Sequence, residues 1–263
     1  MRKYLDLILI GIKEHTAYKS SVWANLLSKV IYLYMQFALW NALFTSNVGI
    51  DIPLDHDDTI RYVIVATIIS TFMECDVIAW INQHIQSGDI ANQLIRPIKY
   101  KAMIFSKNLG TGIIRLVLYA VPLVIVVTVF YHKPVICKEQ LLYSIISVIL
   151  AYIIQFLYSL IIGLMAFWLI VTWPLNMLLA AVYKLLSGSW IPVAMFPELL
   201  AKVNFFLPFR AIYAIPVTLL TTAMDRHDIK EAIGVQLIWI VILFLFSELM
   251  WAVGNKKLVV QGG

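Results

Sequence analysis

The stretch QLLYSIISVILAYIIQFLYSLIIGLMAFWLIVTWPLNMLLAAVY, residues 140–183, contains no Asp, Glu, Lys or Arg. A bilayer core is crossed by about 20 apolar residues in a helix, so this stretch is too long for one crossing. Thr172-Trp173-Pro174 divides it, because proline lacks the backbone N–H and clashes with the preceding turn. We therefore expect one membrane span over residues 141–171 and another over residues 174–190, with Pro174 in the first helical turn.

The rest of the chain is also strongly apolar. Of its 263 residues 62% are hydrophobic and only 13% are charged, and the charged residues fall in a few clusters. Further spans are expected over residues 21–44, 59–81, 104–131 and 229–253, with Gly254 as the stop of the last one. The sequence thus predicts an all-α integral membrane protein with six transmembrane helices in a single domain, residues 1–263.

Residues 1–20 form a different kind of segment. Its apolar run is too short for a signal peptide and is interrupted by Lys13-Glu14-His15. Tyr4, Ile8 and Ile12 share one side of a helix, which predicts an amphipathic helix lying in the membrane interface. A cytosolic helix without membrane contact is the alternative.

Residues 191–228 are too broken by proline for a straight span and too apolar for a solvated loop. We expect an extracellular cap of short re-entrant helices that packs on the fifth and sixth spans, because backbone at membrane depth must be covered by protein or water. The candidate residues of this outer cap are Trp190, Pro192, Phe196, Pro197, Pro208 and Phe209.

The distribution of Lys and Arg indicates the orientation. Basic residues gather in residues 1–20, in the loop between the second and third spans and in the tail: Arg2, Lys3, Lys13, Lys19, Arg96, Lys99, Lys101, Lys107, Lys256 and Lys257. By the positive-inside rule these segments are cytoplasmic, and both termini are expected on that side. Cys75 and Cys137 then fall at different depths, so no disulfide is expected between them.

Charged residues inside the expected spans are costly, and they are usually paired or face a cavity. Glu74 and Arg115 lie at similar depth, so we expect Arg115 to pair with Glu74 or Asp76. Lys184 and Glu248 are expected to pair in the same way. These charges either hold spans together or line a substrate path, and the sequence leaves both roles open.

Several functions have no support in the sequence. It contains no G-x-x-x-x-G-K-[ST] phosphate loop, no H-E-x-x-H metal motif and no arguable Ser/His/Asp or Cys/His set, so neither an enzyme nor a metal site is expected. The net charge of +5 and pI of about 9.1 are better explained by cytoplasmic loops facing anionic headgroups than by nucleic-acid binding.

The loop over residues 84–101 carries the main candidate site. Gly88 breaks the preceding helix, Asp89 is a good N-cap, and Pro97 ends about two turns of helix. Asn92, Gln93 and Arg96 are expected to face a cytosolic partner, while Ile90, Leu94 and Ile95 supply apolar anchors. A basic loop that only binds lipid headgroups is the plainer alternative.

This loop resembles the coupling-helix region of ABC-2 type exporter permeases, in particular a bacterial branch that reads roughly SGELxxxLLRPLxY. The matching residues are Ser87-Gly88-Asp89-Ile90 and Leu94-Ile95-Arg96-Pro97-Ile98-Lys99-Tyr100. Similar motifs extend over nearly the whole chain: Lys3-Tyr4-Leu5, Tyr18-Lys19, Ser187-Gly188, Ile191-Pro192, Phe196-Pro197, Leu207-Pro208-Phe209 and Pro216.

The resemblance implies a permease of the bacterial plasma membrane that works with a separate soluble ATPase. Two ATPase copies, which hold ATP and Mg²⁺, would bind two permease chains, identical or sibling, and this chain would need no cofactor of its own. The residues implied to couple the subunits are Ser87, Gly88, Asp89, Ile90, Asn92, Gln93, Leu94, Arg96 and Pro97. A secondary transporter or channel, and a non-transporting scaffold or immunity protein, are the alternatives.

Overall fold

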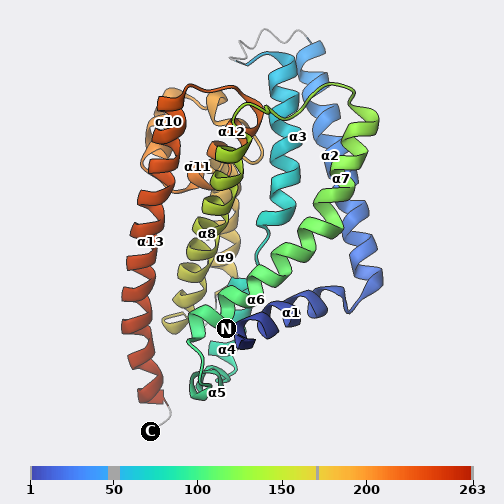
Figure 1. Ribbon diagram of the computed structural model, residues 1–263. Helices are drawn as coiled ribbons and strands as arrows, with labels where there is room; N and C mark the ends of the chain where they lie inside the picture. Colours follow the sequence, from blue (N-terminus) through green and yellow to red (C-terminus); the bar gives the residue numbers. More distant parts are fainter. Residues whose placement is uncertain (1, 47–53, 170–171, 262–263) are drawn as a thin grey trace.

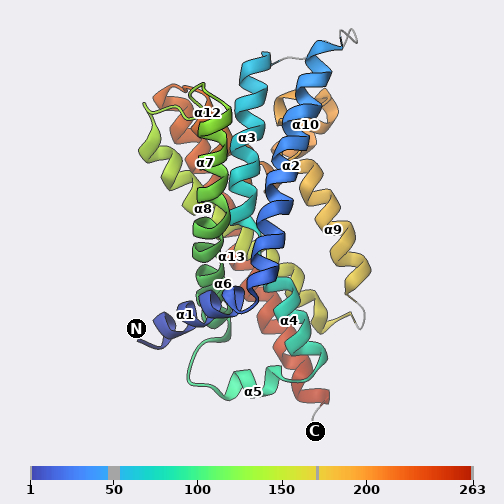
Figure 2. The ribbon, with the colours of Figure 1, turned by 90° about the vertical axis from the view of Figure 1, so that its right-hand side faces the viewer.

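The computed structural model describes residues 2–46, 54–169 and 172–261, and these residues form helices and connecting turns without a strand. Long helices run side by side, and α1 crosses them near one end (Figure 1). That end also carries α5 and the last residues of α13, and we name it the α5 end; the opposite end carries α10 and is named the cap end (Figures 1 and 2).

The helices begin and end as follows: α1 Arg2–Thr16, α2 Lys19–Thr45, α3 His56–Met73, α4 Val77–Gln86, α5 Ile90–Ile95, α6 Tyr100–Arg115, α7 Val121–Phe130, α8 Leu141–Leu164, α9 Trp173–Leu186, α10 Glu198–Phe205, α11 Phe209–Ile212, α12 Ala214–Thr221 and α13 Arg226–Gln261. Short 3₁₀ turns cover Met165–Phe167 and Val193–Met195, and Leu116–Ala120 is a π-helical turn.

Within the described residues, four stretches are helical, long and apolar enough to cross a membrane: His56–Gln86, Tyr100–Phe130, Leu141–Phe167 and Arg226–Lys257. The two other expected spans are also helical. The helix α2 is long enough, but polar residues such as Lys29 and Asn41 lower its hydropathy, and α9 has only 14 residues. The all-helical class is confirmed, and the count of six crossings stays a prediction.

Two expected continuous spans are interrupted. The second span, expected over residues 59–81, is divided by Glu74, Cys75 and Asp76 between α3 and α4. The third, expected over residues 104–131, widens into the π-helical turn directly before Pro122. Proline cannot donate a hydrogen bond to the preceding turn, and a wider turn accommodates it.

Several helices begin or end at other residues than the expected spans do, three of them as follows. The helix α8 ends at Leu164 and a 3₁₀ turn continues to Phe167, so the fourth span is shorter than expected; residues 170–171 lie outside the described residues. The helix of the fifth expected span, α9, ends at Leu186 rather than at residue 190. Gly254 does not stop the last helix, which continues to Gln261, and Gly254 lies against the Phe167 ring instead.

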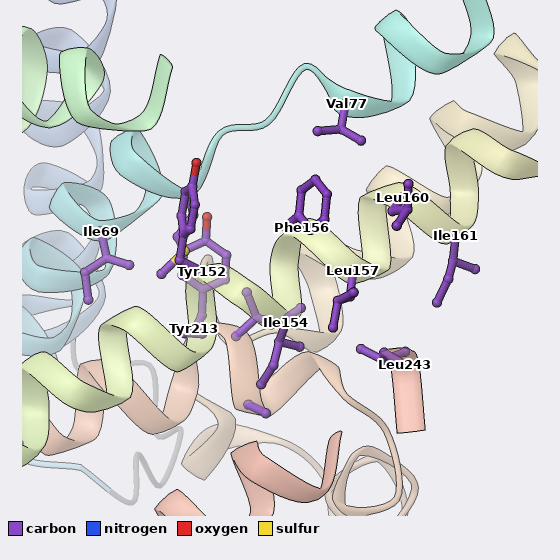
Figure 3. Packing of buried hydrophobic residues seen from close by; sticks show 14 of the residues in the cluster. Ile69, Val77, Tyr152, Ile154, Phe156, Leu157, Leu160, Ile161, Tyr213 and Leu243 are labelled. Carbon is purple, nitrogen blue, oxygen red and sulfur yellow. The ribbon is translucent and has the colours of Figure 1, made fainter. Parts of the chain in front are cut away.

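The hydrophobic core gathers around α8, which is buried on several sides and packs against α13, α4 and α12. Figure 3 shows Tyr152, Phe156 and Leu160 of α8 beside residues of its neighbours. Ile154 and Leu164 are fully buried. Because α8 has an apolar residue at almost every position, it suits the centre of the helix bundle rather than its rim.

The proline-rich segment, which is the expected outer cap, forms short helices at the cap end (Figure 1). Pro192, Pro197 and Pro208 each stand directly before a helix, where the missing N–H costs no hydrogen bond. Phe209 is buried against the Tyr158 ring, whereas Trp190 is about half exposed. The cap packs mainly on α3 and α8, through α12, and less on α9 and α13 than the sequence predicted.

Two glutamines, which the sequence analysis did not single out, satisfy backbone groups of the cap. The Gln140 amide donates to the Leu219 and Thr222 carbonyls at 2.8 and 2.7 Å, and its oxygen accepts from the Met224 N–H. The Gln236 amide donates to the Ala211 carbonyl at 2.9 Å. These bonds close the irregular backbone that a bilayer would leave unsatisfied.

Candidate functional site: the 84–101 loop and the charged break

The 84–101 loop includes the last residues of α4, which ends at Gln86. Gly88 takes a positive φ of 75°, which glycine adopts without strain, and the chain reverses into α5. Arg96 is extended with ψ 141°, as expected for a residue before proline, so Pro97 ends the short helix. This part of the loop follows the prediction from the sequence.

Asp89 occupies the N-cap position of α5, but its side chain makes no capping bond to the backbone. Its two carboxylate oxygens accept hydrogen bonds from the side-chain amides of Asn92 and Gln93, at 3.1 and 2.7 Å. These two bonds lower the pKa of Asp89, which keeps the carboxylate ionised. The Asp89 carboxylate therefore binds two side chains of α5, and not the backbone N–H groups of its first turn.

The two faces of α5 differ from the expected ones. Ile90 is fully buried and Gln93, three residues later, is only 8% exposed, so Gln93 faces the protein and not a partner. Leu94 is 38% and Ile95 is 83% exposed, so of the three expected anchors only Ile90 packs inside the protein. Ser87, Asn92, Arg96 and Pro97 are exposed as well. The exposed face of α5 therefore presents an apolar pair, Leu94-Ile95, beside a cation.

Both ends of the loop are fastened to the helix bundle. His84 and Tyr100 are joined by a hydrogen bond of 2.9 Å, and the Tyr100 ring stacks on Trp251 of α13 with centroids 5.2 Å apart. On the other side, Asn82 donates to the Thr172 hydroxyl at 2.9 Å. These contacts connect the two ends of the loop to each other, to α13 and to the start of α9.

The charged break at residues 74–76 lies at the other end of α4 from the loop. Arg115 of α6 reaches it with Nη2 2.6 Å from Oδ2 of Asp76, while Nη1 donates to the Glu74 backbone carbonyl. The arginine is buried, with only 7% of its side chain exposed. Of the two partners that the sequence left open, the Arg115 ion pair is thus made with Asp76, and the same guanidinium closes the end of α3.

Two neighbours of the break were missed by the sequence analysis. Lys29 of α2 pairs with the Glu74 carboxylate at 2.5 Å, and His15 of α1 bonds with the Tyr119 hydroxyl at 3.1 Å. Lys29 is separated from Glu74 by 45 positions in the sequence. Hydropathy shows that a lysine is unusual inside an apolar helix, but it does not indicate which carboxylate the lysine binds. The helices α2, α3, α4 and α6 thus meet at the break, and α1 lies beside it through the Tyr119 hydroxyl of the π-helical turn.

The expected pair of Lys184 with Glu248 is wrong. Glu248 pairs with Lys101 of α6 at 2.5 Å, near the α5 end. Lys184 lies 5.6 Å from the centroid of the Trp190 ring at the end of α9, and no carboxylate of the described residues is within ion-pair distance of it. Similar depth alone does not make two helices neighbours, and Glu248 lies beside α6 rather than beside α9.

The long apolar helices, with charged residues buried between them, define a multi-pass membrane protein. The family model described as ABC-2 family transporter protein matches residues 30–262, which include the loop and the charged break. The chain therefore belongs to the ABC-2 transporter family and is an ABC-2 type permease, a class that associates in general with an ABC ATPase. A comparison with curated proteins found no match.

Proposed function

We propose that this chain is the membrane subunit of an ATP-driven exporter, coupled through α5 to a separate ATPase that holds ATP and Mg²⁺. The observation that carries the proposal is the exposed face of α5. Ile95, 83% exposed in a polar loop, is the kind of apolar side chain that fills a pocket on a partner. Two permease chains, identical or sibling, would enclose the path, with the α5 end and both termini in the bacterial cytoplasm.

The contacts of the loop supply a route for coupling. Closure of the ATPase dimer would push α5 and the adjoining end of α4. The His84–Tyr100 bond would pass the movement from α4 to α6, and the Asn82–Thr172 bond would pass it to the start of α9. At its far end α4 meets the charged break, where Arg115 holds α6 to Asp76. A movement of α4 therefore changes the position of α3 relative to α6, which is what opening a path between spans requires.

The test is to replace Ile95 by Ser and to measure ATPase affinity and ATP turnover with the permease in proteoliposomes. Full burial of an isoleucine contributes about 1.5–3 kcal/mol, so affinity is expected to fall at least tenfold. The matched control is Ile136→Ser, because Ile136 is 45% exposed at the cap end. It is expected to leave the affinity unchanged.

Two results would contradict the proposal. Equal effects of the two serine variants would remove α5 from the ATPase interface. Transport by the purified chain along an ion gradient, with no ATPase present, would make it a secondary transporter instead.

A further inference from the structure

A cavity of about 440 Å³ lies between α2, α3, α8 and α9, beside the outer cap. Small-molecule sites usually have volumes of about 300–1,000 Å³. Its lining includes Lys29, Glu74, Gln155, Lys184 and Trp190, from elements far apart in the sequence. The loop over residues 84–101 takes no part in it, so coupling to an ATPase does not explain why these polar groups converge.

The cavity carries one uncompensated positive charge. Lys29 and Glu74 neutralise each other at 2.5 Å. Lys184 has the Trp190 ring near its ammonium group but, within the described part of the chain, no carboxylate partner. Lys184 is exposed on the wall of the cavity, so a ligand can reach its ammonium group, and an anion there would supply the missing counter-charge.

Gln155 adds a buried hydrogen-bonding group. It is 8% exposed, and its Oε1 has no hydrogen-bond partner among the described residues, while Nε2 lies 3.5 Å from the Ser159 hydroxyl. An unpaired buried acceptor is unfavourable unless a ligand or water donates to it. A ligand with an N–H or O–H group would satisfy Gln155.

The remaining wall consists of the aromatic rings of Tyr32, Tyr183 and Tyr213, the Met73 side chain, and several Ser and Thr side chains. We propose that this cavity binds an anionic amphiphile that also carries an N–H or O–H donor: the anion on Lys184, the donor on Gln155 Oε1 and the apolar part against the aromatic wall. The proposal rests on the proposed function to the extent that it names the class of cargo for the permease.

The test measures binding to the purified full chain in a non-ionic detergent, with no ATPase or nucleotide present. The probe is N-dodecanoylglycine, which has a carboxylate and an amide N–H. N-dodecanoylsarcosine is its matched comparison, since it keeps the charge and the chain but has no N–H. Dodecyltrimethylammonium reverses the charge. We expect the glycine probe to bind about fivefold more tightly than the sarcosine probe, and the cation to bind weakest.

Variants assign the contacts. Lys184→Gln is expected to weaken both carboxylate probes at least tenfold, and Lys184→Arg to retain binding within about threefold, which separates charge from folding. Gln155→Leu is expected to weaken only the glycine probe, to the level of the sarcosine probe. The control is Lys202→Gln, because Lys202 is exposed on the cap and paired with Glu198. Equal binding of cation and anion, or unchanged binding in Lys184→Gln, would overturn the proposal.

The source of the anion is decided by two further measurements. The first is native mass spectrometry. An anionic lipid that is found on the wild type and is absent from Lys184→Gln assigns the cavity to a resident bilayer lipid. If neither the wild type nor Lys184→Gln carries a bound lipid, and N-dodecanoylglycine raises the ATP turnover of the complex, the cavity is assigned to cargo. Both support the same ligand chemistry. Because binding is measured without the ATPase, its failure leaves the α5 interface untouched, and the reverse also holds.

Discussion

Arg115 brings two kinds of interaction to one buried guanidinium. It neutralises Asp76, and it accommodates the backbone carbonyl that α3 leaves unbonded at Glu74. A lysine in its place could supply the charge but not both directed bonds, because only the planar guanidinium presents several fixed donors. The arginine therefore determines both the position and the shape of the break between α3 and α4.

Removing this guanidinium is expected to be strongly destabilising. Loss of one partner of a buried ion pair costs about 3–5 kcal/mol, and since Asp76 is 44% exposed we expect about 2 kcal/mol for Arg115→Leu. Thermal unfolding of the purified protein in detergent measures it. Lys202→Leu, at an exposed pair, is expected to change stability by less than about 0.5 kcal/mol. Equal effects of the two changes would show that Arg115 does not support the break.

Gly88 and Gly234 make a matched pair for testing backbone conformation. A Cβ at either position would meet no atom within 4 Å, but only Gly88 has a positive φ, 75°. Gly88→Ala is therefore expected to destabilise by about 1 kcal/mol, and Gly234→Ala, inside α13, to stabilise by about 0.5–1 kcal/mol. Chemical denaturation of each variant measures both. Shifts of the same sign would contradict the assigned turn at Gly88.

Among the elements, α1 is held by close packing across α6. A side chain at Gly11 would collide with the backbone of Lys107, and one at Gly110 with the backbone of Ile8. The two helices therefore approach each other more closely than larger residues allow. Lys107 also pairs with Glu14 at 2.7 Å, and the next residue of α1, His15, bonds with the Tyr119 hydroxyl.

The docking of α1 is expected to depend on pH through His15. Burial, and then the charge of Arg115, lower the pKa of His15 below its ordinary value of about 6.5. The unfolded state then binds a proton more readily, so stability is full above about pH 6.5 and falls as the pH decreases through 6.5 toward the lower folded-state pKa. The melting temperature of the wild type should fall more between pH 7.5 and 5.5 than that of His15→Gln. Identical pH profiles would contradict this expectation.

Hydropathy was sufficient to place most helices, because a membrane span requires a long apolar stretch wherever it occurs. The interruptions were not predictable in the same way. At residues 74–76 the matching depth of the charges predicted an Arg115 ion pair, but neither the end of the helix at Glu74 nor the pairing of Lys29 with Glu74 follows from a local pattern. In a helix as short as α5, the sequence did not show that Gln93 turns inward, since its bond to Asp89 decides the side that faces the protein.

At the scale of the whole molecule, Cys137 lies toward the cap end and Ser87 at the α5 end (Figure 1), so the proposed orientation puts them on opposite sides of the membrane. Both cysteines are unpaired, as expected. In a Cys75→Ser background, an impermeant maleimide added outside intact cells should label Cys137. A Ser87→Cys variant without Cys137 should be labelled only after the membrane is permeabilised. Labelling of residue 87 from outside would reverse the proposed orientation.

The π-helical turn before Pro122 also shifts the helical register of everything that follows it. It holds one more residue than an α-helical turn would, and each residue of an α-helix advances about 100° around the axis. Deleting a single residue from Leu116–Ala120 would keep the segment apolar and helical, yet rotate α7 by that angle. Leu123 and Val127, now buried in a cluster with Leu33 and Trp40, would turn outward. One inserted amino acid thus selects which side of a transmembrane helix faces its neighbours.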